Sequence, residues 1–378
     1  MSVRCLDLFS GIGGMALGVH RVCPSARIWK MCDIDAACRE LFARHFGPVE
    51  VCDDVRALRG SPAARVALVY GGFPCQDVSA AGKRAGVVRG ERSSLFREMI
   101  RLGVECQAAY IFLENVAALE HNGLDEVVRC LTEAGWTEIR SVVCGADQVG
   151  GRHRRRRIFI LAHNRRFRNS ASRSLEISAA VQGTTSWIGD EPSDLPRLQP
   201  KHGPDAEWVN AIRMLGNSCV PQQAELALRF MLQGRGANPG GEGGGAALNW
   251  DEAWDQGEWN GGEDAELEEE LEAELEPLPP PPAGSHSSPP VHLYKIMHRR
   301  VAAEMAPTLI AYDCFGGKNA HRNADGSYGS MTLAKWVRHN PDHGTWGTTL
   351  RRKREVVEGQ VLSVPWATWF MGFPRGWL

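Results

Sequence analysis

The sequence predicts an α/β protein whose core is a parallel, doubly wound sheet. Through about the first 165 residues, short apolar runs rich in β-branched side chains alternate with amphipathic stretches of helical length. Strands that alternate with helices in this way build parallel sheets with helices on both faces. Hydrophobic residues make up 43 % of the chain and charged residues 23 %, which is typical of a soluble globular protein.

Strands are expected where the apolar runs lie, and helices where the spacing of apolar residues has a helical period. The region 164–206 is polar and has no clear period, so we expect an irregular excursion there, followed by a helix over 221–233. The expected strands are 3–9, 26–32, a short one before Asp54, 64–72, 108–116, 137–146 and 157–162. The expected helices between them are 35–46, 93–106 and 123–135.

The composition divides the chain into a large first domain, a linker and a second module. Residues 234–290 are rich in Gly, Glu and Pro and lack the hydrophobic mix of a core, so we expect a disordered linker after a first domain over 1–233. From Val291 the composition is globular again, with five tryptophans between 336 and 377. A small second module is therefore expected over 291–378.

The net charge of −2 conceals an uneven distribution. Fourteen of the 45 acidic residues fall between Ala237 and Pro290, a stretch without Lys or Arg. The rest of the chain has 43 basic and 31 acidic residues, a net charge of +12. A basic protein with an acidic insert favours a polyanionic partner.

Targeting and cysteine signals are absent from the sequence. No apolar run approaches the roughly 18 to 20 residues that span a bilayer, and the first residues have no signal-peptide layout. The eleven cysteines form no CxxC pair, so neither a metal site nor a disulfide framework is expected. A cytoplasmic protein without a membrane partner is the expectation.

The first predicted strand runs into DLFSGIGG (7–14), whose glycines let backbone amides approach a ligand closely. Asp33 follows the next strand, where a carboxylate can accept both ribose hydroxyls of a nucleoside cofactor. Asp54 follows the third strand and could accept an adenine amine. Two alternatives stay open: a tight structural turn, or an NAD site, although the glycine spacing is not GxGxxG.

The stretch GGFPCQDVS (71–79) follows the fourth strand and places Cys75 where reactive groups of such sheets lie. The glycines and Pro74 before it favour an exposed turn and a thiolate nucleophile over an inert core cysteine. Glu114 ends the fifth strand and could donate a proton to a ring nitrogen. A glutamate that caps the next helix is the competing interpretation.

The basic run GRHRRRRIFILA (151–162) leads into the last strand. With a period of two, its side chains divide between two faces, one facing the ligand crevice and the other meeting phosphates. A solvated basic run or a targeting signal would have the same periodicity. His153, Arg155 and Arg157 form one face, and Arg152, Arg154 and Arg156 form the other.

Taken together, these motifs resemble those of the DNA (cytosine-5)-methyltransferase family, in phage- or bacterial-like form. The matching stretches, in order, are DLFSGIGG, GGFPCQDVSAAGKRAG with RSSLFREM, FLENV, HRRRRIF and MLGNSCVPQQ. The resemblance covers most of 3–163 and 208–233. It implies a Rossmann-like, S-adenosylmethionine-dependent methyltransferase domain over 1–233 and a small target-recognition module over 291–378.

The resemblance also implies a role for each site residue. Cys75 would add to C6 of a cytosine flipped out of duplex DNA, and Glu114 would hold N3 and the exocyclic amine. Arg157 would contact the base O2, Arg155 would support the pocket, and the loop 77–93 would close on DNA. S-adenosylmethionine would be held by Phe9, Gly11, Gly13, Asp33, Asp54, Pro74, Leu95, Asn217 and Ser218.

The chain departs from the family pattern in motif order. His153 and Asp33 replace the family's Gln and Glu, and GNSCVP (216–221) precedes the GFP-containing stretch instead of following it. We therefore expect a rearranged member in which residues 366–377 fold back onto the first domain. Double-stranded DNA, a monomeric state and a cognate restriction endonuclease are the expected partners and assembly. An RNA (tRNA) cytosine-5 methyltransferase and a catalytically silent DNA-binding homologue remain alternatives.

Overall fold

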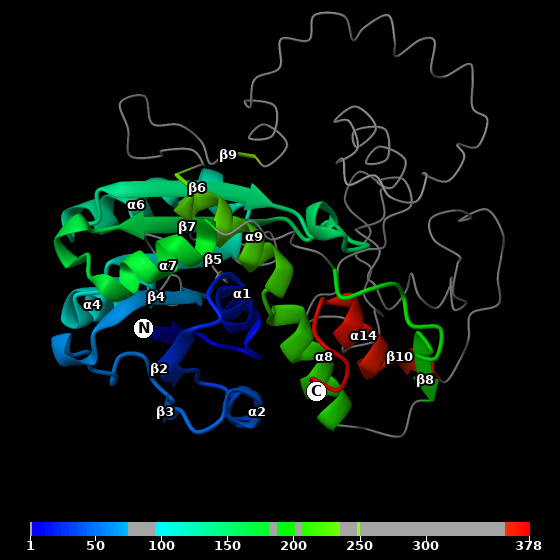
Figure 1. Cartoon of the computed structure of the whole chain (residues 1–378). Coiled ribbons are helices and arrows are strands. Elements are labelled where there is room, and N and C mark those ends of the chain that lie inside the picture. Colours follow the sequence, from blue (N-terminus) through cyan, green and yellow to red (C-terminus); the bar gives the residue numbers. More distant parts are fainter. Residues whose placement is uncertain (1, 75–94, 181–186, 201–205, 235–247, 250–359) are drawn as a thin grey trace, which may run out of the picture.

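The computed structural model describes residues 2–74, 95–180, 187–200, 206–234, 248–249 and 360–378. Within these ranges, eight strands form one large sheet with helices on both faces (Figure 1). The expected α/β class is therefore confirmed. From one edge to the other the strands are β3 (Glu50–Cys52), β2 (Ala26–Cys32), β1 (Val3–Leu8), β4 (Val66–Gly72), β5 (Tyr110–Val116), β7 (Arg157–His163), β6 (Glu138–Cys144) and β9 (Leu248–Asn249).

The sheet is mostly parallel, but β7 runs antiparallel to both of its neighbours, β5 and β6. The prediction of a wholly parallel sheet is wrong at this strand. Residues 145–156 between β6 and β7 contain only the short helix η3 (Asp147–Val149), and a parallel connection needs a longer crossover. As a result, the first residue of β7, Arg157, lies at the edge where β4 and β5 end.

Successive side chains along a strand of the sheet point alternately into two separate apolar cores. On β7, Ile158 and Ile160 face one core, whereas Phe159 and Leu161 face the other. Each fully buried side chain of this size contributes about 1.5–3 kcal/mol through removal of apolar surface from water. The first core includes α4 (Phe96–Cys106) and α6 (Leu124–Glu133); the second includes α1 (Gly14–Val22), α7 (Ser170–Ala180) and α9 (Pro221–Leu232).

The region 164–206, expected to be irregular, contains the helix α7. Leu175 and Ala179, four positions apart, are buried in the second core, while Ile177 is 68 % exposed. The serine-rich sequence around them gives a weak helical period, and tertiary packing of this one face stabilises the helix. The remaining short elements of the first domain are α2 (Ala36–Phe46), η1 (Pro62–Ala64), α5 (Leu119–Asn122) and η4 (Arg165–Phe167).

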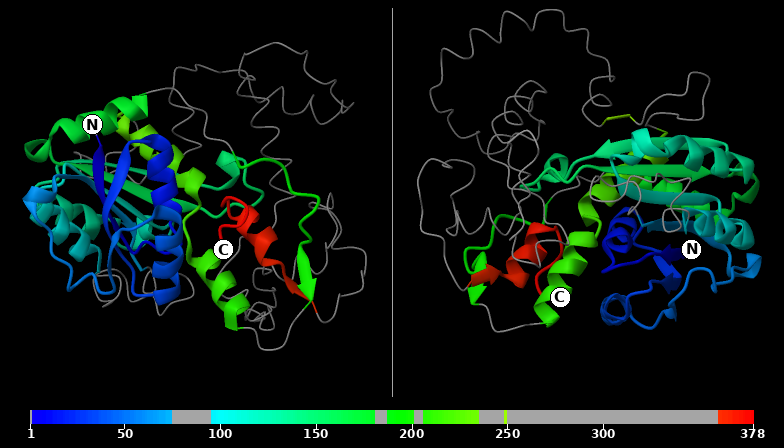
Figure 2. Two further views of the ribbon diagram at one scale, coloured as in Figure 1. Left: turned by 60° about the horizontal axis from the view of Figure 1, so that its bottom comes forward. Right: turned by 180° about the vertical axis from the view of Figure 1, so that it is seen from behind.

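A smaller unit lies beside the large sheet and joins distant parts of the chain. Strand β8 (Leu198–Pro200) pairs antiparallel with β10 (Gln360–Leu362), and α14 (Val364–Phe370) packs against α8 (Ala206–Asn217) (Figure 2). We call residues 360–378 the tail segment. Its aromatic side chains share a third apolar core with residues of the first domain, including Ile12 and Leu41. The expectation that 366–377 fold back onto the first domain is confirmed.

Most of the predicted linker and second module, 234–290 and 291–378, lies outside the described residues, so these domain boundaries stay predictions. Strand β9 falls within the predicted linker and extends the sheet beside β6. No helix in the described ranges is long and apolar enough to cross a membrane.

Candidate functional site

The loop that follows β1 is held in a tight, largely left-handed conformation. Phe9, Gly11 and Gly13 have positive φ angles of 54°, 51° and 87°. A β-carbon added at Gly13 would lie 2.6 Å from the ring of Phe46, so only glycine fits there without movement. At Gly11 nothing lies within 4 Å of such an atom, which leaves open space next to its backbone.

Asp33 joins this loop to the end of β2. One carboxylate oxygen accepts from the Gly11 amide at 2.7 Å, and the other accepts from the Asp35 amide at 2.8 Å. Burial raises the pKa of Asp33, although the two hydrogen bonds from the backbone act in the opposite direction. Each carboxylate oxygen has a further lone pair, so Asp33 can still accept from a ligand hydroxyl. The structure therefore brings Asp33 and Gly11 together, as the sequence predicted.

Ile34 is a neighbour that the sequence analysis missed. Its side chain is 82 % exposed, next to Asp33 and at the carboxyl edge of the sheet. A large apolar side chain this exposed provides a surface on which a planar ring can pack. A lone isoleucine after a strand gives no signal of this kind in the sequence.

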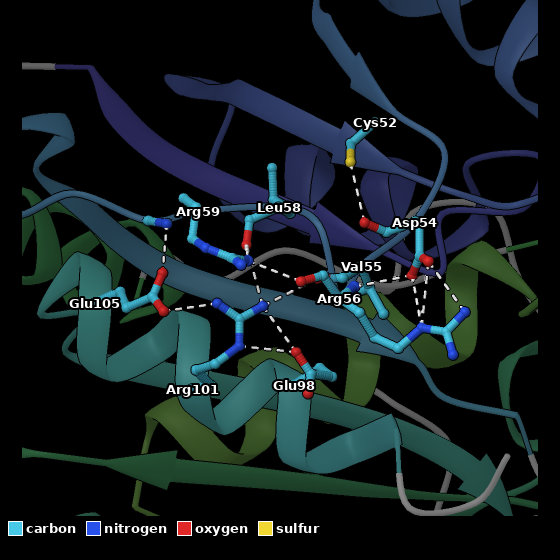
Figure 3. Close-up of polar contacts among 10 residues, drawn as sticks. Cys52, Asp54, Val55, Arg56, Leu58, Arg59, Glu98, Arg101 and Glu105 are labelled. Atoms are coloured by element: carbon cyan, nitrogen blue, oxygen red, sulfur yellow. Dashed lines mark hydrogen bonds and ion pairs between the residues drawn. The ribbon is translucent and has the colours of Figure 1, made fainter. Parts of the chain in front are cut away.

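Asp54 fits its predicted role less well, because its carboxylate is bound by Arg56 (Figure 3). Arg56 approaches with Nε at 3.0 Å from Oδ1 and Nη2 at 3.0 Å from Oδ2. Hydrogen bonding to Arg56 lowers the pKa of Asp54. The pairing lies on a partly exposed surface, and an incoming amine would compete with Arg56 for the carboxylate.

The loop that carries Asp54 is tied to α4 (Figure 3). Arg101 donates to the carbonyls of Val55 and Leu58 at 3.0 and 3.1 Å, and Glu105 accepts from the Gly60 amide at 2.6 Å. The same guanidinium pairs with Glu105 along the helix at 2.6 Å. These contacts fix the position of the loop relative to α4.

The turn after β4 leads to the predicted nucleophile. Gly71 passes so close to β1 that an added β-carbon would lie 1.8 Å from the Leu8 carbonyl oxygen. Asn115 donates its side-chain amide to the Phe73 carbonyl at 3.0 Å and so fixes the backbone just before Pro74. Cys75 itself lies outside the described residues.

The loop 77–93 also lies outside the described residues. The chain is described again from Leu95, which immediately precedes α4 and packs against the first core.

Glu114 and Arg157 form an ion pair at the ends of β5 and β7. Arg157 Nε lies 3.1 Å from Glu114 Oε1, and their side chains are 17 % (Arg157) and 12 % (Glu114) exposed. Burial raises the pKa of Glu114, whereas Arg157 and then Arg155 act to lower it. An added β-carbon at Gly72 would lie 2.5 Å from the other carboxylate oxygen, so this glycine makes room for the acid.

The basic run before β7 divides into the two faces that its period predicted. His153 and Arg155 are buried and Arg157 is mostly buried. The side chains on the other face, Arg152, Arg154 and Arg156, are exposed. This alternation is confirmed.

Arg155 holds the junction between α8 and α9, with a strained φ of 25°. Its guanidinium donates to the carbonyls of Gly216 at 2.8 Å and Ser218 at 2.6 Å. These bonds position Asn217, which is exposed at the end of α8. Arg155 thus acts on the predicted cofactor turn through hydrogen bonds, and on Glu114 through its charge.

Gln223, which the sequence analysis did not single out, ties the same region together. Its side-chain amide donates to the carbonyls of Cys144 at 2.7 Å and Arg155 at 2.8 Å. A buried amide that bonds two strand ends is invisible to sequence periodicity, because a helix with a glutamine at this position normally exposes it.

His153 connects the basic run to the tail segment. Its Nε2 lies 3.0 Å from the Phe370 carbonyl, which can only accept, so Nε2 carries the proton. Burial lowers the pKa of His153 to about 3, and the nearby Arg155 acts in the same direction. His153 is therefore a neutral donor at neutral pH.

In the described part of the chain, no group of three His, Cys, Asp or Glu side chains is placed to hold a metal ion. The nine cysteines described there are free thiols.

Comparisons with known proteins identify relatives of this chain. The type II methyltransferase M.CviJI of Paramecium bursaria Chlorella virus IL3A is 30 % identical over 240 residues, which cover 62 % of this chain and 60 % of the relative. The type II methyltransferase M2.BsuMI of Bacillus subtilis (strain 168) is 32 % identical over 168 residues, 42 % of each chain. The chain thus spans between about two fifths and three fifths of the length of these relatives.

Among solved structures, the Entamoeba histolytica methyltransferase EhMeth is 16 % identical with a TM-score of 0.39, and the match covers 52 % of this chain and 63 % of that one. The family of C-5 cytosine-specific DNA methylases matches residues 3–225, which contain every described site residue. The chain therefore belongs to the C-5 cytosine-specific DNA methylase family.

Proposed function

We propose that this protein transfers a methyl group from S-adenosylmethionine to C5 of a cytosine in duplex DNA. The observation that carries the proposal is the Glu114–Arg157 pair, which lies at the sheet edge where β4 leads towards Cys75. An acid and a guanidinium suit a pyrimidine ring that must be protonated on one side while a thiolate attacks it on another.

The loop after β1 and Asp33 are suited to hold the cofactor. Left-handed residues turn the backbone tightly here, the Gly11 amide holds Asp33 in place, and the space next to Gly11 is open. The buried Asp33 carboxylate would accept ribose hydroxyls, and the exposed Ile34 would cover the adenine ring. When bound, the cofactor supplies an electrophilic methyl group on a sulfonium.

The chain's own residues would activate the cytosine. A base inside a duplex is out of reach, so the cytosine would first be flipped into the pocket. The Cys75 thiolate would add to C6 while Glu114 delivers a proton to N3, and the C5–C6 electron pair would then become nucleophilic at C5. After methylation, a base removes the C5 proton, the C5–C6 double bond re-forms as the C6–S bond breaks, Cys75 is released as a thiolate, and N3 returns its proton to Glu114.

Arg157 would hold Glu114 in position and donate to the base O2. Burial raises the pKa of Glu114 and outweighs the lowering by Arg157 and Arg155, which makes the carboxyl a better proton carrier than an exposed glutamate. The exposed Arg152, Arg154 and Arg156 would meet DNA phosphates next to the pocket. We expect a monomeric enzyme in the cytoplasm of a bacterial or phage-infected cell.

The test is to express the full chain in a host without cytosine methylation and to sequence its DNA after bisulfite treatment. Methylated cytosines in a fixed sequence context are expected with the wild-type chain and not with Cys75→Ala. DNA that stays unmethylated with both chains, while tRNA gains the methyl group, would replace the proposal with the RNA alternative. No transfer to either nucleic acid would leave only a binding protein.

A further inference from the structure

We infer that Trp377 is a positioning residue for the cofactor: it fastens together the two segments that would hold S-adenosylmethionine. The inference rests on the proposed function and adds to it a residue far away in sequence. Its basis is that Trp377 makes one hydrogen bond to the loop after β1 and another to α2, the helix that starts next to Asp33.

The first bond reaches the middle of the loop. The indole N–H of Trp377 donates to the Ile12 carbonyl at 2.9 Å, and Trp377 is only 7 % exposed. Ile12 lies between Gly11 and Gly13, two of the left-handed residues of the loop, and its side chain is buried in the third core. The bond therefore fixes the short stretch of backbone between the two glycines.

The second bond reaches α2. His45 Nε2 lies 2.6 Å from the Trp377 carbonyl, and the two rings stack with centroids 3.8 Å apart and an interplanar angle of 6°. The helix is capped at its start by Asp35, two residues after Asp33. Trp377 thus joins the loop after β1 to the last turn of α2, the helix that follows Asp33.

The tail segment is itself bound to α9 and packed against α1, and these contacts fix the position of Trp377. Gln222 donates its side-chain amide to the Gly372 carbonyl at 3.0 Å. Gly372 has a φ of 76°, and an added β-carbon would lie 2.3 Å from Gln222 Oε1. The buried Phe373 lies against Gly14, with its ring 3.3 Å from where a β-carbon of that glycine would be.

We expect Trp377 to affect the affinity for the cofactor more than the rate of methyl transfer. The two hydrogen bonds of Trp377 go to Ile12 and to His45 in the last turn of α2, and they restrain the loop backbone, which must be in place before the cofactor arrives. A loop that is already ordered loses less conformational entropy on binding, so removal of the restraint weakens affinity. One neutral hydrogen bond corresponds to about a 2- to 10-fold change in an equilibrium constant.

The experiment compares Trp377→Phe with Trp208→Phe in the full chain. Phenylalanine keeps an aromatic ring against His45 but has no N–H for Ile12. Trp208 belongs to the same apolar core, and its indole N–H donates to the Leu362 carbonyl at 2.8 Å, away from the loop. Titration calorimetry with S-adenosylmethionine gives the Kd, and methylation assays give kcat and the cofactor KM.

We expect Trp377→Phe to raise the cofactor Kd and KM about 3- to 10-fold, with kcat at saturating cofactor within about 2-fold of wild type. Trp208→Phe should lower the Tm about as much as Trp377→Phe does, but it should leave the cofactor Kd unchanged. Equal Kd values for the two variants, or a loss confined to kcat, would overturn the inference. A wild-type chain that binds no S-adenosylmethionine would instead overturn the proposed function.

Discussion

Glu114 shows how opposing influences set the state of one side chain. Burial raises its pKa, two arginines lower it, and Gly72 leaves the space in which its carboxylate lies. Asp54 shows the opposite case, because Arg56 binds both of its oxygens on a partly exposed surface. Sequence position placed both acids at strand ends, and only the neighbouring side chains distinguish them.

Replacement of Glu114 by Gln should abolish most activity and spare cofactor binding. Gln cannot deliver a proton, and loss of general acid catalysis typically costs about 10²- to 10⁴-fold in rate. A methylation assay on DNA should show kcat lower by about that factor, with an unchanged Kd for S-adenosylmethionine. The exposed Glu133→Gln is the control and should retain full activity. Normal activity in Glu114→Gln would remove this residue from the chemistry.

His153 should make the fold less stable in acid. Its pKa is about 3 in the folded chain and about 6.5 when unfolded, so below pH 6.5 the unfolded state binds more protons. Stability contributed by the neutral ring is complete above pH 6.5 and is lost as pH falls towards 3, with about 2 kcal/mol gone by pH 5.

Urea unfolding at pH 7.5 and pH 5 measures this effect. His153→Gln can still donate to the Phe370 carbonyl but does not titrate, so its stability should fall by about 2 kcal/mol less than that of wild type over the same interval. An equal fall in the two proteins would mean that His153 is not buried in a neutral state.

At the scale of elements, the residues that organise the site lie at or near the ends of helices and strands and not in their middles. Arg155, two residues before β7, bonds the carbonyls where α8 passes into α9, and Gln223 in α9 bonds the end of β6 and the Arg155 carbonyl. Motif spacing predicted that Arg155 shares one face of its run with His153 and Arg157. It could not predict that the guanidinium would bond main-chain carbonyls, since those carbonyls are distant in sequence.

Arg155→Ala should lower the free energy of unfolding by about 2–4 kcal/mol, because two buried carbonyls would be left without their charged donor. The neighbouring Arg154→Ala, whose side chain is exposed, should change it by less than about 0.5 kcal/mol. Denaturant titrations of the two variants provide the comparison. A similar effect at both positions would contradict the role of Arg155 as a clamp on this junction.

At the scale of the whole molecule, the strand order brings the basic face of 152–156 to the same edge as the carboxylates. The sequence predicted six long strands within a few residues of their observed bounds, because apolar runs and β-branched residues mark them clearly. It could not predict the direction of β7, since periodicity is the same for both directions. Nor did it predict α7, which depends on packing against the second core.

The exposed arginines should determine how DNA binding responds to salt. Neutralisation of Arg152, Arg154 and Arg156 to Gln should reduce the slope of log K against log salt by about 0.9 for each DNA phosphate that the variant no longer neutralises. Arg165 and Arg166, exposed at the other end of β7, form the control pair and should leave the slope unchanged. Fluorescence anisotropy of a labelled duplex at several salt concentrations measures both. Equal slopes in all three proteins would move the DNA interface elsewhere.

The pairings of β9 and β10 have a consequence for the chain length that the fold tolerates between them. β9 lies beside β6 and β10 beside β8, so residues 250–359 are attached to the fold at two separate places. The closure cost of such a segment grows only slowly with its length. The chain length between these two pairings can therefore change at little cost in closure entropy.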